Sequence, residues 1–383
     1  MFERRDWVLH FHRLTKKDLK LLGKLGYAPI TVMENLKLVV ISAPKISWRP
    51  FRTFRRLTLF KFLKKLMPKL NHIDKDFEVK ALLDVSTKQI GAQNVWIQTN
   101  GKPYKYGKGI KIAVIDTGID RHHTDLANRI AEYKDFTGDG EKDISCHGTS
   151  TASCCAGNGN MSMGKYRGMA CLATLYIAKA LGDSGSGSAI SITRAIDWAI
   201  SQGVDIISMS LGAPARKGGD VLSHAARHAC TEHGIIVVVA AGNDPSRIDT
   251  PGCEESVITV GAYDGKEDRG RVASFSGRGP TKDGIVKPDV ISPGVKICMA
   301  KSKDSDAAQA DNGYTIASGT SFSCPLVAGG IALLIAKKKI SPQGVKSLLM
   351  DTAKSLGDSY SEFAQGKGLV DFEEAMSRVD EYK

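Results

Sequence analysis

The chain has 383 residues, of which 42% are hydrophobic and 25% are charged, so a wholly disordered protein is excluded and a large core can form. The net charge of +12 comes from residues 1–80, which carry 19 basic and 7 acidic side chains, whereas the remaining residues carry 34 of each. This step in charge predicts a domain boundary near residue 80.

All eight cysteines lie on the neutral side of that boundary, and none has the C-x-x-C spacing of a structural zinc site. We expect buried free thiols, although an even number leaves disulfides open in an oxidising or hyperthermophilic source. The eight are Cys146, Cys154, Cys155, Cys171, Cys230, Cys253, Cys298 and Cys324.

The opening MFERRDWVLHFHRL lacks the apolar stretch of a secretory signal. We expect no later stretch to reach the about 18 apolar residues that a membrane-spanning helix needs. These observations predict a cytoplasmic location. A signal already removed, or another export route, is the alternative.

The basic segment alternates strand and helix patterns. WVLHFHRL (7–14) alternates like a strand, and Thr15 is a plausible N-cap for the helical spacing that follows it. Two further strands are predicted over 28–35 and 36–44, a second helix within 51–67, and a last strand over 72–80. The order β-α-β-β-α-β predicts a small ferredoxin-like α+β domain.

Residues 45–70 contain nine basic and no acidic side chains, interleaved with phenylalanines. One interpretation is a helix that contacts a membrane surface or a nucleic acid. We favour an amphipathic helix that packs on its own sheet, so no nucleic-acid partner is expected, and peripheral membrane contact through 45–70 is the weaker alternative.

From about residue 108 the pattern changes to buried strands separated by helices. Runs such as IKIAVIDTG, VDIISMSLG and GIIVVVAAGN are almost continuously apolar, which is typical of parallel strands covered on both faces. Two segments with helical spacing end at Gly203 and Gly234, which are natural C-cap residues. The sequence therefore predicts an α/β domain with a mainly parallel sheet.

Polar residues follow several of these strands, at the sheet edge where reacting groups gather in such folds. Asp116, Ser210 and Asn243 stand in short turns that contain glycine, His147 precedes a helical segment, and Ser321 lies in SGTSFSCP. Any one of them alone is a common turn former or helix cap. Their joint order carries more information.

The order Asp116, His147, Asn243, Ser321, with the contexts DTG, HGT, AAGN and GTS, resembles the subtilisin-like serine proteases, or subtilases. The segments SLG (210–212), SFSGRGP (274–280) and VKPDVISPG (286–294) resemble the same family. The resemblance runs from about Asp84 to the end of the chain. It implies a three-layer subtilisin-like catalytic domain over 84–383.

The resemblance implies a catalytic triad of Asp116, His147 and Ser321, with Asn243 in the oxyanion hole. The chemistry agrees, because a serine hydroxyl needs an imidazole to take its proton, and the imidazole needs a carboxylate to orient and stabilise it. An amide donor then stabilises the oxyanion. We predict a serine endopeptidase of broad specificity that needs no cofactor for its chemistry.

The resemblance also implies that substrate polypeptides lie extended between two edge segments, 180–187 and 209–213, by backbone pairing. The predicted substrate-binding residues are Leu181, Gly182, Ser210, Leu211 and Gly212. The small residues of 209–213 and 240–243 predict a primary pocket with room for a large apolar side chain.

Residues 1–83 resemble a subtilase propeptide in size and element order, which implies an intramolecular inhibitor and folding aid. We expect self-cleavage between Val79 and Ser86. A permanently retained basic module is the alternative, and an inactive, protease-shaped binding protein is a further rival.

Several residues depart from the family pattern. Ser150 follows the base where histidine is usual, Cys171 stands where proline is frequent, and Phe322 and Cys324 follow the nucleophile. Phe322 could alter packing beneath the nucleophile, and Cys324 could make activity sensitive to oxidation.

Calcium is a possible stabiliser, because Asp125 matches a ligand position of the family. The acidic loop DFTGDGEKD (135–143) has no EF-hand spacing, and a solvated loop is the favoured interpretation there.

Overall fold

The computed structural model describes most of the chain from residue 106 onward and parts of the chain before it. The helix predicted within 51–67 lies outside the described residues, as do residues 45–69 of the basic segment. The described residues are 4–24, 29–33, 35, 37–44, 70–75, 78–81, 90–91, 95–96, 106–265, 270–310 and 312–383.

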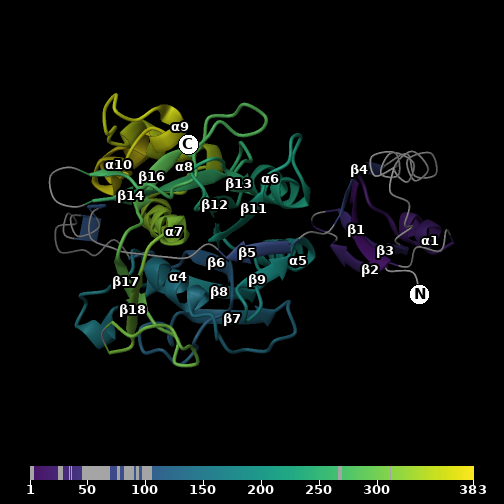
Figure 1. Ribbon diagram of the computed structural model, residues 1–383, viewed down its shortest axis with the longest axis horizontal. Coiled ribbons are helices and arrows are strands. Elements are labelled where there is room, and N and C mark those ends of the chain that lie inside the picture. The colour runs from purple at the N-terminus through teal and green to yellow at the C-terminus, as the bar shows by residue number, and fades with distance from the viewer. Residues whose placement is uncertain are drawn as a thin grey trace.

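The N-terminal region forms a small antiparallel sheet (Figure 1). Its strand order is β2-β3-β1-β4, as expected of a ferredoxin-like arrangement. Helix α1 begins directly after Thr15, whose hydroxyl donates to Asp18 at 2.6 Å, so the predicted start is confirmed. The elements are β1 (Arg4–Phe11), α1 (Lys16–Lys24), β2 (Pro29–Met33), β3 (Leu38–Pro44) and β4 (Leu70–Lys75).

The larger part of the chain is built on a mainly parallel sheet, as predicted (Figure 1). Seven of its strands follow the order β15-β14-β12-β10-β6-β8-β7, and β16 pairs with β14. Only the pairing of β14 with β15 is antiparallel among the described strands of this sheet. The strands are β6 (Lys111–Asp116), β7 (Ile130–Asp135), β8 (Thr174–Lys179), β10 (Ile206–Met209), β12 (Ile236–Ala240), β14 (Ile258–Asp264), β15 (Arg271–Val272) and β16 (Val290–Pro293).

Helices cover both faces of this sheet, which confirms the three-layer architecture. In β6, Ile112 and Val114 belong to one buried cluster, while Ala113 and Ile115 belong to the other, as the alternation of a strand requires. The first cluster includes residues of α4 (His147–Ala156), α7 (Thr320–Lys337), α8 (Pro342–Thr352) and α10 (Phe372–Arg378). The second includes residues of α5 (Ala189–Ser201) and α6 (Val221–His233). Helix α6 ends at Gly234, in a left-handed conformation, as predicted.

The N-terminal sheet packs against this second layer. Met33, Leu38 and Val40 belong to the same buried cluster as the apolar faces of α5 and α6. The backbone oxygen of Asn35 lies 2.5 Å from Nε2 of His228 on α6. The two parts of the chain therefore share one continuous apolar interface.

Smaller elements complete the fold. Another four-stranded sheet has the order β13-β11-β5-β9, and β17 pairs with β18. These elements are β5 (Glu78–Ala81), β9 (Ser186–Ser188), β11 (Leu211–Pro214), β13 (Asp249–Thr250), β17 (Ile297–Ala300), β18 (Tyr314–Ala317) and α9 (Glu362–Gln365).

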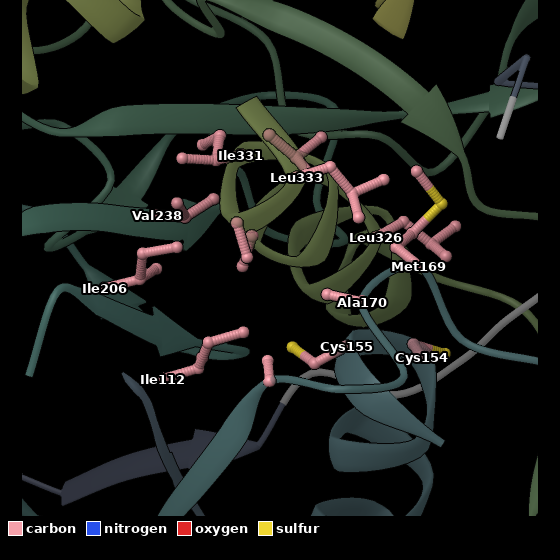
Figure 2. Packing of buried hydrophobic residues seen from close by; sticks show 14 of the residues in the cluster. Ile112, Cys154, Cys155, Met169, Ala170, Ile206, Val238, Leu326, Ile331 and Leu333 are labelled. Atoms are coloured by element: carbon pink, nitrogen blue, oxygen red, sulfur yellow. The ribbon is translucent and has the colours of Figure 1, made fainter. Parts of the chain in front are cut away.

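Helix α7 is the central helix of the core (Figure 2). Its 18 residues have a mean hydropathy of 1.5, long and apolar enough to cross a membrane, although we predicted no such run. Because 89% of the helix is buried inside the protein, its apolar character is that of a core helix.

Gly329 lets α7 approach α4 closely. A β-carbon at this position would stand 2.6 Å from the carbonyl oxygen of Cys155 and 2.7 Å from Cβ of Met169. The first atom is backbone of α4, which cannot move aside cheaply. The absence of a side chain at Gly329 thus sets the spacing of the two helices.

We therefore expect Gly329→Ala to destabilise the protein by about 1–3 kcal/mol, although alanine is the better helix former. The measurement is urea or thermal unfolding of the full chain. Gly23→Ala in α1 is the control, because nothing lies within 4 Å of that position, and it should be neutral or mildly stabilising. Equal stability of Gly329→Ala and the unmodified chain would contradict this account of the packing.

Candidate functional site

The structure brings Asp116 and His147 together in a buried pair. Asp116 ends β6, His147 begins α4, and Nδ1 of His147 lies 2.7 Å from Oδ1 of Asp116. Oδ1 also accepts from the Thr117 backbone N–H at 2.7 Å, and Oδ2 accepts from the Thr151 hydroxyl at 3.2 Å. Because Asp116 and His147 are at most 2% exposed, the carboxylate fixes the ring orientation without competition from water.

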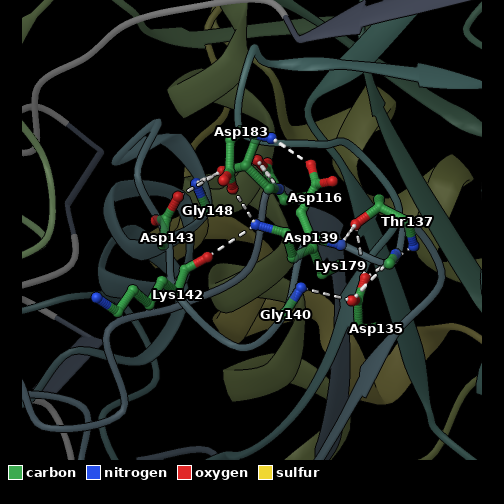
Figure 3. A network of polar contacts seen from close by, with 12 residues as sticks. Asp116, Asp135, Thr137, Asp139, Gly140, Lys142, Asp143, Gly148, Lys179 and Asp183 are labelled. Atoms are coloured by element: carbon green, nitrogen blue, oxygen red, sulfur yellow. Dashed lines mark hydrogen bonds and ion pairs between the residues drawn. The ribbon is translucent and has the colours of Figure 1, made fainter.

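A second buried carboxylate, Asp143, holds the start of α4 (Figure 3). Its oxygens accept from the Thr149 N–H at 2.7 Å, the Thr149 hydroxyl at 2.6 Å and the Thr117 hydroxyl at 2.8 Å. The Thr117 hydroxyl in turn accepts from the Gly148 N–H at 2.8 Å. Burial raises the pKa of Asp143, and the hydrogen bonds oppose that rise.

Asp143 is thus a positioning residue that we did not predict. We interpreted the loop 135–143 as a solvated acidic loop, yet Asp143 is fully buried. The nearby Asp135 instead accepts from the backbone N–H groups of Thr137, Gly138 and Gly140, which fits the solvated-loop interpretation. A carboxylate four residues before the predicted base, at the start of a helix, was the available signal.

Ser321 is the second residue of α7, close to its N-terminal end, where backbone N–H groups lack partners within the helix. Its hydroxyl is fully buried in the whole chain and has no hydrogen-bond partner among the described residues. The bond from serine to imidazole is therefore not formed within the described part of the chain. Such bonds often form only when substrate is present.

Asn243 follows β12 and is held by the first residue of α7. Its Oδ1 accepts from the N–H of Thr320 at 3.0 Å and from the Thr320 hydroxyl at 3.1 Å. With the amide oxygen engaged in this way, the Nδ2 group is directed elsewhere as a donor. Thr320, another positioning residue that we did not predict, thereby couples Asn243 to the helix that carries Ser321.

The residues that depart from the family pattern all lie in the core. The Phe322 ring lies 5.5 Å from the His147 ring, so Phe322 packs on the imidazole. The Ser150 hydroxyl donates to the Ala300 carbonyl at 2.9 Å. These side chains support the site by packing and leave Asp116 paired with His147.

A strand of this same chain lies between the two predicted peptide-pairing segments. Strand β5 lies between β11 and β9, with Ala81 opposite Leu211, Lys80 opposite Gly212, and Val79 opposite Gly187.

The other predicted substrate-binding residues do not pair with this strand. Leu181 is fully buried in the core, and the Gly182 N–H donates to Ser186, so the residues that pair on that side are Ser186–Ser188. The Ser210 hydroxyl donates to the backbone oxygen of Ser321, the predicted nucleophile.

Asp125, the predicted calcium ligand, is buried and bonded to protein donors. Its Oδ1 accepts from the Met161 N–H at 3.0 Å, and its Oδ2 accepts from the Tyr314 hydroxyl at 2.5 Å. Each oxygen therefore accepts one protein hydrogen bond, and a calcium ion at this position would have to share the oxygens with these donors. In the described part of the chain no group of three or more His, Cys, Asp or Glu side chains could hold a metal.

Comparisons with known proteins agree with this geometry. The model of the subtilase family matches residues 107–368. Serine protease AprX of Bacillus subtilis is 37% identical over 326 residues, which are 78% of this chain and 72% of AprX. Subtilisin DY of Bacillus licheniformis is 38% identical over 288 residues, 73% of this chain and 94% of that protein.

A solved structure shows the same fold. Fervidolysin from Fervidobacterium pennivorans, described as a keratinolytic enzyme related to subtilisin, superimposes with a TM-score of 0.75 at 21% sequence identity. The superposition covers 98% of this chain, and the chain spans only 61% of the fervidolysin chain.

The eight cysteines are free thiols, and Cys324 is among the fully buried ones. Its sulfur donates to the carbonyl of Val238 at 3.4 Å, and burial raises the pKa of this thiol to about 12. Oxidation proceeds through the thiolate, so our hypothesis of a redox-sensitive Cys324 is not supported.

Because burial shields the Cys324 thiol from reagents and raises its pKa, iodoacetamide should leave it unmodified in the folded protein at pH 8. The measurement is peptide mapping by mass spectrometry before and after unfolding. Cys298, the one cysteine that is not buried, is the internal comparison and should be alkylated first. Alkylation of Cys324 in the folded protein at the rate of Cys298 would contradict the burial argument.

Proposed function

The chain belongs to the subtilase family of serine proteases, and from this premise we propose that it is an endopeptidase made as a self-processing zymogen. The observation that carries the proposal is the position of β5, which pairs on both sides with strands of the predicted substrate cleft. Its substrates are polypeptides that bind in the same extended form. Backbone pairing does not depend on the side chains of the substrate, so most substrate positions tolerate many different residues.

In the proposed mechanism, His147 takes the proton of the Ser321 hydroxyl as Oγ attacks the carbonyl carbon of the peptide bond. Asp116 holds the ring and stabilises the imidazolium that forms. His147 then gives the proton to the leaving amine, and water hydrolyses the acyl-enzyme on Ser321. This chemistry uses side chains of the protein and requires no cofactor.

The oxyanion of the tetrahedral intermediate would be stabilised by Nδ2 of Asn243 and the backbone N–H of Ser321. Thr320 contacts both ends of this arrangement, since it bonds Oδ1 of Asn243 and directly precedes Ser321 in α7. The donors are therefore preorganised before substrate arrives.

The proposed inhibitor is the N-terminal domain of residues 1–83. It has two points of attachment: its sheet packs on α5 and α6, and β5 occupies the cleft. Joining the two attachments in one chain raises the effective concentration of the strand at the site. Release would require cleavage of the connection between β5 and the catalytic domain.

We expect purified wild-type protein to lose an N-terminal fragment that ends between Val79 and Ser86, and Ser321→Ala protein to keep it. Because the register runs from Lys80 opposite Gly212 to Ala81 opposite Leu211, toward Ser210 and Ser321, the cut should follow Ala81 closely. Intact mass and N-terminal sequencing of both proteins test this. Identical, uncut masses would contradict self-processing.

Labelling with an active-serine phosphonate probe is the independent control. It should modify Ser321 in processed wild type and leave Ser321→Ala unmodified. Failure of processed wild type to react would instead support an inactive, protease-shaped binding protein.

Removal of the side-chain oxyanion donor by Asn243→Ala should lower kcat by about 100- to 1000-fold with little change in KM, as the equivalent loss does in a subtilisin. The measurement is steady-state hydrolysis of a peptide substrate by protein matured in trans. Asn158→Ala, which removes an amide that bonds the Asn160 N–H, is the control and should not affect kcat. A rise in KM at unchanged kcat would show that Asn243 binds the ground state instead.

A further inference from the structure

Two glycines lie near the predicted nucleophile and the bound strand. Gly212 lies on β11, opposite Lys80 of the bound strand. The N–H of Gly242 donates to the Thr320 hydroxyl at 3.2 Å, and Gly242 directly precedes Asn243. The space beside both glycines therefore adjoins the peptide-pairing strand and the oxyanion donor, where the side chain before the cleaved bond must lie.

A carboxylate stands in this space. A β-carbon at Gly212 would lie 2.8 Å from Cβ of Asp249, and a β-carbon at Gly242 would lie 2.9 Å from its Oδ2. Strand β13 holds Asp249 there, because Asp249 pairs with Pro214 of β11. We expected small residues around an apolar pocket, but the structure adds an acidic side chain that the sequence alone did not place there.

The partners of Asp249 leave one of its oxygens open. Oδ1 accepts from Nε of Arg247 at 2.9 Å, whereas no described residue donates to Oδ2. Asp249 is only 4% exposed, yet Oδ2 is not among the fully buried side-chain atoms that lack a partner, so this oxygen retains some access to solvent. Burial raises the pKa of Asp249, and the Arg247 charge opposes that rise.

The side chains that form ion pairs around Asp249 have a negative net charge. Arg247 also forms an ion pair with Asp244, so the three side chains sum to one negative charge. The Arg247 side chain is 40% exposed and can turn toward solvent when another cation approaches Asp249. An apolar guest would desolvate Oδ2 and leave it without a donor, whereas an ammonium or guanidinium group would supply one.

We propose that Asp249 makes this protease select substrates with lysine or arginine immediately before the cleaved bond. The inference rests on the proposed function, since it assigns the specificity of the same site. It concerns substrates cleaved in trans. Self-processing is intramolecular, and its high effective concentration removes the need for a preferred residue at the junction.

The test uses processed wild-type protein and peptides that differ only at the residue before the cut: Arg, Lys, Gln, Leu or Phe. The expected kcat/KM for Arg and Lys exceeds that for Leu and Phe by at least about 10-fold. Equal or faster cleavage of the Leu and Phe peptides would overturn the inference, and this measurement needs no variant.

Asp249→Asn keeps the shape of the side chain and removes its charge. It should lower kcat/KM for the Arg and Lys peptides by about 10- to 100-fold and change the Phe value only a few-fold. Asp264→Asn is the matched control, because Asp264 is also a mostly buried carboxylate paired with an arginine, Arg271, and its loss should leave the peptide ranking unchanged. An unchanged ranking in Asp249→Asn would also overturn the inference.

Labelling of Ser321 by the phosphonate probe distinguishes failure of the specificity inference from failure of the proposed function. Protein that labels but does not prefer Arg and Lys contradicts the role of Asp249 alone. Protein that neither labels nor cleaves any peptide contradicts the proposed function and the inference together.

Discussion

The close packing of α4 against α7 is the constraint on which the site depends. Both helices lie on the same face of the sheet, and each carries a residue of the predicted triad in its first turn, His147 in α4 and Ser321 in α7. Their backbones approach at Gly329, where a side chain would meet the Cys155 carbonyl. Since packed helices are not continuously deformable, this contact fixes where the two N-terminal ends lie. Asp116, at the end of β6, completes the arrangement from the sheet.

The buried carboxylates around this centre differ in how many of their oxygens accept hydrogen bonds. Asp116, Asp125 and Asp143 each accept hydrogen bonds on both oxygens, so their charges serve to hold loops, rings and helix starts in place. Asp249 is nearly as buried, yet Oδ2 receives no donor from the described residues. A carboxylate with one oxygen that receives no protein hydrogen bond, next to the predicted substrate site, can attract a cationic ligand. This is the property of a binding group rather than of a structural one.

The position of β5 would link the proposed latency to substrate binding. Since β5 pairs antiparallel with both β9 and β11, one strand satisfies the edges of two segments that would otherwise expose unpaired backbone groups. The proposed substrate would satisfy the same edges after the N-terminal domain leaves. The apolar contact of Met33, Leu38 and Val40 with the α5 and α6 layer would hold the domain in place until then.

The sequence by itself determined the fold class and the order of the candidate residues, because apolar periodicity and short glycine-bearing turns are local properties. The resemblance of the ordered motifs to the subtilases then pointed to Asp116, His147, Asn243 and Ser321 without coordinates. Only the tertiary structure decided which groups surround Asp143, Asp125, Thr320 and Asp249, because those groups come from other elements of the fold. It also placed Ser186–Ser188, rather than Leu181 and Gly182, against the bound strand. The register of paired strands and the partners of a buried charge depend on contacts across the fold, and no local pattern records them.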